Sequence, residues 1–196
     1  MPRMKFMNIE IDNITMSEAL EKINWLIKQD KNAYVVTPNV DHIIQIEQGG
    51  KLCEVYENAD LILADGKPLI WISKWYGSPI KQKVSGSDLF PLLCEMAATK
   101  KYKMFLLGAA EGVADKAAKN LTERNSGLQK VGTYSPPYGF EKDSFEIKKI
   151  IKMIKEKKPQ ILIVGLGCPK QELFIYNHKD ELEVPVALGL RASIDF

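Results

Sequence analysis

Short apolar runs alternate along this chain with segments whose apolar residues recur at helical spacing. The apolar runs and one alternating segment predict strands over residues 5–11, 33–36, 61–64, 103–107, 128–134, 161–164 and 184–188. Helical segments are expected near residues 20–27, 41–48, 69–75, 88–99, 113–120, 143–158 and 170–180. Buried strands that alternate with helices are typical of a parallel sheet covered on both faces. We therefore predict an α/β fold with a mostly parallel sheet covered by helices, Rossmann-like in its second half and mixed in its first lobe.

The domain prediction is one compact α/β catalytic core over residues 1–196 with two lobes. The first lobe, about residues 1–100, begins with a strand that alternates polar and apolar residues. The second lobe, about residues 101–196, is a regular series of strands and helices and is the candidate nucleotide-binding lobe. A capping box of Thr15 and Glu18 predicts the start of the first helix.

Composition excludes several classes of protein. The 196 residues carry 27 basic and 25 acidic side chains, a formal charge of +2 that argues against a general nucleic-acid binder. No apolar run approaches the roughly 18–20 residues of a membrane span, and the charged N-terminus is unlike a signal peptide. The three scattered cysteines, Cys53, Cys94 and Cys168, predict a reducing compartment and small buried thiols rather than disulfides.

We expect catalytic and binding residues directly after the predicted strands, because ligands of open α/β sheets bind beyond the carboxyl ends of the strands. Asp65 comes directly after an apolar run and precedes Gly66. A carboxylate held there against apolar walls can act as a general base, although an Asx turn or helix cap also explains it. Thr37 and Asn39 flank a proline after another strand and could either bind a polar ligand or cap the next helix.

Two glycine-rich loops lead from strands into helices. Gly108 and Gly112 stand in one loop, and Gly165 and Gly167 stand in the other. Such loops let backbone amides approach a phosphate at a helix N-terminus, but they also form tight turns. Neither loop has the G-x-G-x-x-G or the Walker A spacing, which disfavours a nicotinamide-dependent oxidoreductase.

No metal site is expected from the sequence. The two histidines, His42 and His178, are far apart in the chain, and no Cys-x-x-Cys or strand-end Asp-x-Asp is present. Trp71 and Trp75 lie four residues apart on a helix, so they are expected in the core or between lobes. If they are exposed, the pair could contact an apolar acceptor.

These motifs together resemble the WecG/TagA/CpsF family of bacterial glycosyltransferases over nearly the whole chain. The Gly-x-Gly-x-Pro-Lys-Gln-Glu run and the Ala-Asp-Gly strand end are its most specific parts. The motifs that carry the resemblance are Thr37-Pro38-Asn39, Ala64-Asp65-Gly66, Val84-Ser85-Gly86-Ser87-Asp88, Leu106-Leu107-Gly108, Gly165-Leu166-Gly167-Cys168-Pro169-Lys170-Gln171-Glu172 and Ala192-Ser193-Ile194-Asp195-Phe196.

The resemblance implies an inverting, metal-independent transferase with no cofactor. Its expected donor is UDP-N-acetylmannosamine, and its expected acceptor is N-acetylglucosamine on undecaprenyl diphosphate, as in teichoic acid linkage-unit synthesis. Asp65 would be the general base. The resemblance implies substrate binding by Thr37, Asn39, Lys83, Gly86 and Asp88. It implies donor-nucleotide binding by Gly108, Gly112, Gly165, Gly167, Lys170, Gln171 and Glu172.

The chain departs from the family pattern at two positions and at its end. Lys83 replaces a common arginine and keeps the charge without the bidentate fork, and Arg191 replaces a glycine. From the resemblance we expect a basic, aromatic C-terminal segment that contacts the membrane, and we expect this chain to lack it after Phe196. We expect a cytoplasmic protein peripheral to the inner face of the bacterial membrane that self-associates through apolar surface. A non-catalytic nucleotide or sugar-phosphate binding domain is the alternative.

Overall fold

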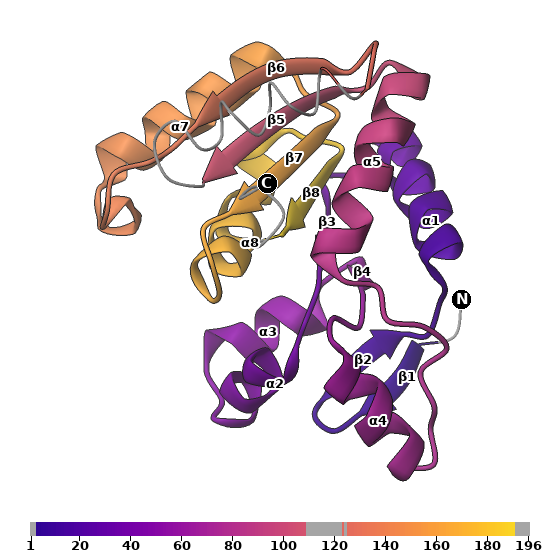
Figure 1. Cartoon of the computed structure of the whole chain (residues 1–196). Coiled ribbons are helices and arrows are strands. Elements are labelled where there is room, and N and C mark those ends of the chain that lie inside the picture. Colours follow the sequence, from indigo (N-terminus) through magenta and orange to yellow (C-terminus); the bar gives the residue numbers. More distant parts are fainter. Residues whose placement is uncertain (1–2, 109–122, 124, 191–196) are drawn as a thin grey trace.

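The fold is built on one six-stranded parallel sheet. The computed structural model describes residues 3–108, 123 and 125–190 (Figure 1). All pairs in the sheet are parallel, and its strand order is β4-β3-β8-β7-β5-β6. The strands are β3 (Ala33–Val36), β4 (Leu61–Ile62), β5 (Lys103–Gly108), β6 (Gln129–Tyr134), β7 (Ile161–Gly165) and β8 (Val186–Gly189). The predicted α/β fold with a mostly parallel sheet is confirmed, and strands from both halves of the chain pair where β3 meets β8.

Helices cover both faces of the sheet, because successive side chains of each buried strand point to opposite faces. Tyr34 joins one buried cluster and Val35 joins the other. The Val35 side packs against α1 (Met16–Gln29) and α5 (Gly86–Lys100), which lie side by side in Figure 1. The Tyr34 side is covered by α2 (Val40–Glu47), α3 (Lys51–Glu57), α7 (Ser144–Lys157) and α8 (Lys170–Leu182).

The N-terminal strand differs from its prediction. Residues 5–11 were expected as one strand, but the chain forms a hairpin of β1 (Arg3–Phe6) and β2 (Ile9–Asp12), paired antiparallel. The chain reverses at Met7, whose φ of 53° is left-handed and incompatible with a continuous strand. The alternation of polar and apolar residues persists on both sides of the turn, which is why it imitates a single strand.

The two tryptophans of α4 (Lys67–Trp75) are exposed, so the prediction that they are core or packing residues is wrong. Trp71 is 65% exposed and Trp75 is 90% exposed. The inward face of the helix is formed by Leu69 and Ser73, which are buried and four residues apart. Trp71 lies two residues from each of them, about 200° around the helix and therefore on its outer side.

Local signals at the helix ends agree with the structure where it describes them. The predicted capping box is confirmed: the Thr15 hydroxyl accepts from the Glu18 N–H, and the Glu18 carboxylate accepts from the Thr15 N–H. A short 3₁₀ turn, η1 (Phe140–Lys142), precedes α7. The helix expected near residues 113–120 lies outside the described residues, as does the motif at 192–196. Within the described ranges no helix combines the length and the hydropathy that crossing a bilayer requires.

Candidate functional site

A cavity of about 210 Å³ opens at the carboxyl ends of the central strands. The segments that follow β3, β4 and β7 meet there with the first turn of α5. Ligand sites of parallel sheets form at this edge, where strand order reverses. The residues that line the cavity are Thr37, Asn39, Asp41, His42, Gln45, Asp65, Gly86, Ser87, Cys168 and Gln171.

Asp65 is a half-buried carboxylate fixed at the wall of this cavity. Its backbone N–H donates to the Pro38 carbonyl at 2.9 Å, and its Oδ2 accepts from the Gly86 N–H at 3.4 Å. Burial raises the pKa of the Asp65 carboxyl, because removal from water disfavours the charged form. The Gly86 hydrogen bond and the charge of Lys83 lower that pKa and oppose burial without cancelling it. The arrangement produces a carboxylate that is more basic than an ordinary aspartate and that faces a cavity.

Thr37 and Asn39 reach the same cavity from the loop after β3. The Thr37 hydroxyl donates to the Gly189 carbonyl at 3.3 Å, which ties the end of β3 to the end of β8. The Asn39 side-chain oxygen accepts from the His42 N–H at 3.1 Å and thereby caps α2. The capping interpretation of Asn39 is therefore correct, and its position on the cavity wall leaves the amide nitrogen as its group for a ligand.

First-turn residues of three helices line the cavity. Asp41 and His42 belong to the first turn of α2, Gly86 and Ser87 begin α5, and Gln171 is the second residue of α8. Each helix N-terminus carries a partial positive charge and backbone N–H groups without helical partners. Their convergence favours an anionic ligand such as a diphosphate.

Gln171 and Glu172 form a buried polar pair beneath the cavity. The Gln171 Oε1 accepts from the Gly167 N–H at 3.2 Å, and its Nε2 donates to Glu172 Oε1 at 2.8 Å. Burial raises the pKa of the Glu172 carboxyl, and the hydrogen bond from Gln171 lowers it in part. Gln171 also packs against Gly189, where an added Cβ would come within 3.2 Å of its Nε2. The pair therefore sets the shape of the cavity floor.

One group of side chains near the cavity has the chemistry of a metal site. A ring nitrogen of His42, the Cys168 sulfur and a Glu172 carboxylate oxygen all lie within 4.8 Å of one another. Nitrogen, thiolate and carboxylate ligands are those that zinc prefers. His42 also hydrogen-bonds the Tyr56 hydroxyl through Nδ1 at 3.0 Å. The spacing along the chain does not indicate this group, because His42 and Cys168 lie 126 positions apart.

Lys83 and Asp88 pair with each other beside the cavity and are not among the residues that line it. The Lys83 Nζ lies 2.7 Å from Asp88 Oδ2, and that oxygen also accepts from the Ser85 hydroxyl at 2.6 Å. The ion pair raises the pKa of the Lys83 ammonium and lowers that of the Asp88 carboxyl. Asp88 therefore holds the Lys83 charge, which acts on Asp65 through space.

Lys170 points away from the cavity. Its ammonium pairs with Glu141 at 2.8 Å and lies 5.0 Å from the centre of the Tyr138 ring. This ion pair raises the pKa of the ammonium. Lys170 thus joins the first turn of α8 to the 3₁₀ turn η1, whereas the next residue, Gln171, turns toward the cavity.

The described glycines of the two predicted loops have a backbone role. Gly108 has a φ of +113°, and a Cβ added there would lie 2.5 Å from the Gly165 carbonyl oxygen. Gly108 and Gly165 are register partners at the carboxyl ends of β5 and β7. Gly167 has a φ of +79°, and Gly112 lies outside the described residues. The close approach of β5 and β7 therefore explains why residue 108 is a glycine, whether or not a ligand binds there.

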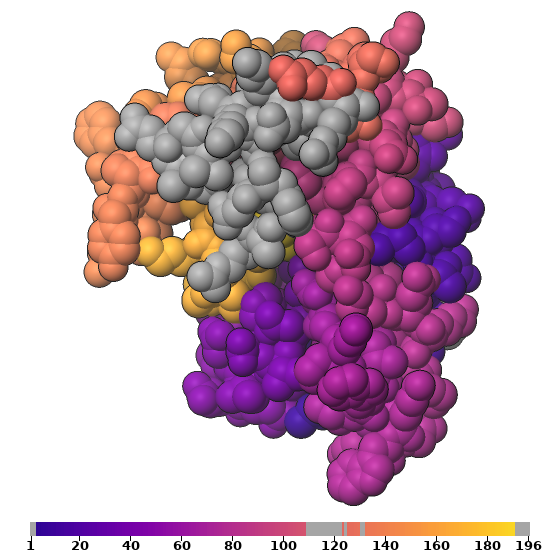
Figure 2. Space-filling model, in the orientation of Figure 1, coloured from indigo at the N-terminus to yellow at the C-terminus, as the bar shows by residue number. Residues whose placement is uncertain are grey.

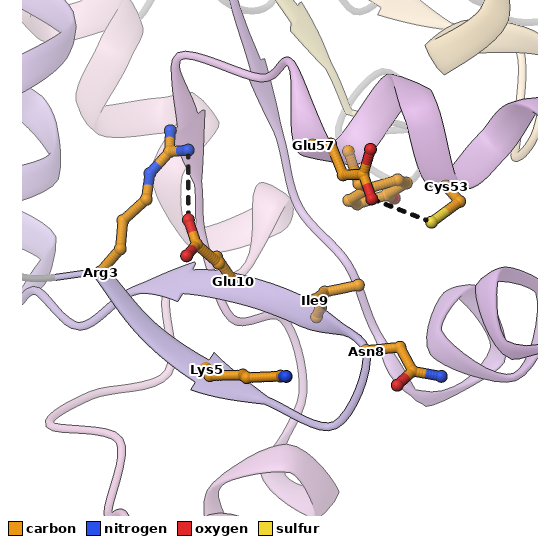
Figure 3. Close-up of a pocket in the computed structure, with 8 residues that line it drawn as sticks. Arg3, Lys5, Asn8, Ile9, Glu10, Cys53 and Glu57 are labelled. Atoms are coloured by element: carbon orange, nitrogen blue, oxygen red, sulfur yellow. Dashed lines mark hydrogen bonds and ion pairs between the residues drawn. The ribbon is translucent and has the colours of Figure 1, made fainter.

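A second cavity, of about 390 Å³, lies between the β1–β2 hairpin and α3 (Figure 3). Within it Arg3 lies 3.8 Å from Glu10, and the Cys53 thiol donates to Glu57 at 3.5 Å. None of its lining residues follows the carboxyl end of a strand of the parallel sheet. Although this cavity is larger, the smaller one at the strand ends has the chemistry of a site.

The structure brings together part of the predicted site and adds residues that the sequence did not indicate. Of the predicted set, Thr37, Asn39, Asp65, Gly86 and Gln171 meet at the cavity. The residues that were missed are Asp41, His42, Gln45, Ser87 and Cys168. A sequence signal existed for the first three, because they follow the predicted strand end at the spacing of one helix face.

Comparison with known proteins identifies the family. A protein from Bacillus spizizenii named N-acetylglucosaminyldiphosphoundecaprenol N-acetyl-beta-D-mannosaminyltransferase is 32% identical over 169 residues, which are 86% of this chain and 63% of that protein. A Staphylococcus aureus protein of the same name is 26% identical over 195 residues, 98% of this chain and 74% of that protein. The chain thus spans less than two thirds of the Bacillus protein. The family model described as "Glycosyl transferase WecG/TagA/CpsF family" matches residues 4–196, and the chain therefore belongs to this glycosyltransferase family.

Proposed function

We propose that this protein transfers N-acetylmannosamine from its UDP donor to N-acetylglucosamine carried on undecaprenyl diphosphate. The family membership and the names of both relatives support the transfer and the acceptor. The observation that carries the proposal is Asp65, a carboxylate of raised pKa on the wall of the strand-end cavity. The β-linked product in the relatives' names supports inversion, because a sugar nucleotide with an α-linked sugar gives a β product by a single displacement.

In the proposed reaction Asp65 is the general base. The acceptor hydroxyl oxygen bonds to the anomeric carbon of N-acetylmannosamine while the bond from that carbon to the UDP oxygen breaks. The hydroxyl proton passes to the Asp65 carboxylate, and UDP leaves with the electron pair. The transition state has oxocarbenium character, as in glycoside hydrolysis. Thr37 and Asn39, on the same wall, position the sugars.

We propose that the leaving diphosphate is stabilised without a metal ion. The first turns of α2, α5 and α8 supply partial positive charge at the cavity, and the Lys83 ammonium, paired with Asp88, lies nearby. Preorganised dipoles of this kind stabilise developing charge without reorganisation. Transfer activity that EDTA leaves unchanged is the expected result, and activity that returns only with a divalent ion would refute this part.

The lipid-linked acceptor supports a protein that works peripherally at the cytoplasmic face of the bacterial membrane. The sugar to be modified is joined to the membrane through a diphosphate, so the cavity must come close to the lipid surface. Self-association of the chain also remains a prediction, and light scattering at several protein concentrations tests it.

The decisive experiment compares Asp65→Asn with Asp41→Asn, since both carboxylates line the same cavity. Transfer from UDP-N-acetylmannosamine to a short-chain lipid-diphosphate acceptor is measured together with UDP binding. We expect Asp65→Asn to lose about 10²–10⁴-fold in rate and to keep UDP affinity, because a general base contributes that factor. Asp41→Asn is expected to stay within about tenfold of the parent. Equal losses in the two variants, or a larger loss at Asp41, would exclude Asp65 as the base.

The pH dependence provides a second readout. Since burial raises the pKa of the Asp65 carboxyl, kcat/KM should rise with pH through a value above that of an ordinary aspartate. Asp65→Asn should lose this limb of the profile. UDP binding without transfer at any pH, to any sugar acceptor, would instead support a non-catalytic nucleotide-sugar binding domain.

A further inference from the structure

Helix α4 presents an aromatic surface that no described part of the chain covers. Trp71, Trp75 and Tyr76 are each more than 60% exposed, whereas Leu69 and Ser73 face inward. In the common view of Figures 1 and 2, α4 and the segment after it project from the lower end of the molecule. Large exposed aromatic side chains in a cluster mark an interaction surface.

The same surface is basic. Lys67 and Lys74 are exposed and lie four and three residues from Trp71, so they share its side of the helix. Neither lysine forms an ion pair with any residue in the described part of the chain. Residues 66–84 contain four lysines and no aspartate or glutamate. We call Lys67, Trp71, Lys74, Trp75 and Tyr76 the α4 surface.

The α4 surface is held rigidly on the fold. The buried Ser73 hydroxyl donates to the Ile70 carbonyl at 2.8 Å and accepts from the Ile80 N–H at 3.0 Å, which fixes the segment that leaves the helix. The Tyr76 ring packs 6.4 Å from Phe6 of the hairpin, centre to centre. The exposed aromatics are therefore displayed by a fixed helix and not by a loose loop.

The α4 surface is also tied to the candidate site. Only Gly66 separates Asp65 from the first residue of α4. At 1.5 Å per residue, Trp75 lies about 12 Å along the helix axis from that start. A surface that holds the tip of α4 would therefore hold the Asp65 cavity at a short, fixed distance.

We propose that the α4 surface docks on an anionic lipid bilayer, with Trp71 and Trp75 at the level of the headgroups. Tryptophan combines an apolar ring with a polar N–H and collects at membrane interfaces. The lysines bind anionic headgroups while their carbon chains follow the apolar boundary. The bound orientation delivers the lipid-linked acceptor to Asp65, a consequence that rests on the proposed function, although the docking itself does not.

Charge distinguishes a bilayer from a second copy of this chain as the occupant. A twofold contact would place the α4 surface of one copy against the same surface of the other. The lysines would then face lysines, with no acidic residue in 66–84 to compensate them. An anionic bilayer provides the compensating charge at every position.

Vesicle sedimentation of the 196-residue protein tests the proposal. We expect binding to phosphatidylglycerol–phosphatidylcholine vesicles at low salt and at least tenfold weaker binding to pure phosphatidylcholine. Trp71→Ala with Trp75→Ala should weaken partitioning at least tenfold, and Lys67→Gln and Lys74→Gln about fivefold each. The controls are Trp25→Ala, an exposed tryptophan beside Lys22 on α1, and Lys152→Gln on α7, which should bind as the parent does.

A fluorescence measurement separates docking from a loss of folding. In a Trp25→Phe background only the α4 tryptophans emit, and brominated phosphatidylglycerol should quench them on vesicle binding. Equal binding by the α4 and control variants, or no binding by the parent, would overturn the proposal. Lipid-free dimerisation that Trp71→Ala abolishes would assign the surface to a second copy instead. A water-soluble acceptor should be glycosylated equally by the parent and the α4 variants, so failed docking and failed transfer are distinguishable.

Discussion

Replacing Gly108 with alanine is expected to destabilise the fold by about 2–5 kcal/mol, because two separate costs coincide at this residue. Its φ of +113° lies in a region that L side chains rarely adopt. The added Cβ would also lie 2.5 Å from the oxygen and 2.6 Å from the carbon of the Gly165 carbonyl. Both are backbone atoms of a central strand, so neither can rotate away. The conformational strain contributes about 1–2 kcal/mol and the overlap about 1–3 kcal/mol.

Equilibrium unfolding in urea, followed by far-UV circular dichroism, measures this loss. Gly139→Ala is the matched control, since that residue has a φ of +82° but no atom within 4 Å of an added Cβ. It should lose only the strain contribution, about 1–2 kcal/mol. A Gly108→Ala loss no larger than that of Gly139→Ala would refute the close approach of β5 and β7 as the reason for glycine at 108.

Three further substitutions test other parts of the structure. Thr15→Ala should cost about 1 kcal/mol in urea unfolding, because the N-cap of α1 is lost; an unchanged midpoint would contradict the capping box. Ser73→Ala should lower the free energy of unfolding by about 1–3 kcal/mol, since the buried Ile80 N–H loses its acceptor. An unchanged free energy of unfolding would mean that this hydrogen bond does not hold α4 in place. Burial raises the pKa of Glu172, so its contribution to stability is present at low pH and is lost as pH rises through the raised value. Glu172→Gln should flatten that decline in melting temperature between pH 4 and 8, and an unaltered decline would contradict the shift.

The sequence located the site as far as local patterns determine it. Buried strands of a parallel sheet appear as continuous apolar runs, and their carboxyl ends meet at one edge. That rule brings Thr37, Asp65 and Gln171 to a common edge of the sheet, and the structure places them at one cavity there. The sequence did not predict which strand ends share the cavity, because that depends on the strand order, in which β4, β3, β8 and β7 lie next to one another.

The sequence did not predict which side chains of a helix point inward where the apolar pattern of that helix is ambiguous. In α4 the run Leu69-Ile70-Trp71-Ile72 is apolar on all sides, so periodicity does not identify the inward face. The hydrogen bonds of Ser73 decide it, because a buried hydroxyl must be paired. Lys170 shows a similar limit: its partner Glu141 is distant in the chain, and only the fold brings them together.

A single residue, Gly66, joins Asp65 at the cavity to the α4 surface. Hydrogen bonds beside this residue would keep the geometry of the site unchanged when α4 docks. Gly66 has a φ of +107°, and this conformation turns the chain from Asp65 into α4. On the other side of that turn the backbone is held twice: the Asp65 N–H donates to Pro38, and the Ala64 carbonyl accepts from Val84, each at 2.9 Å. A displacement of α4 at a bilayer would thus be resisted by the hydrogen bonds to these two neighbouring segments, which hold the backbone at Asp65. Docking would therefore orient the cavity toward the lipid without changing the burial of Asp65, which raises the pKa of its carboxyl.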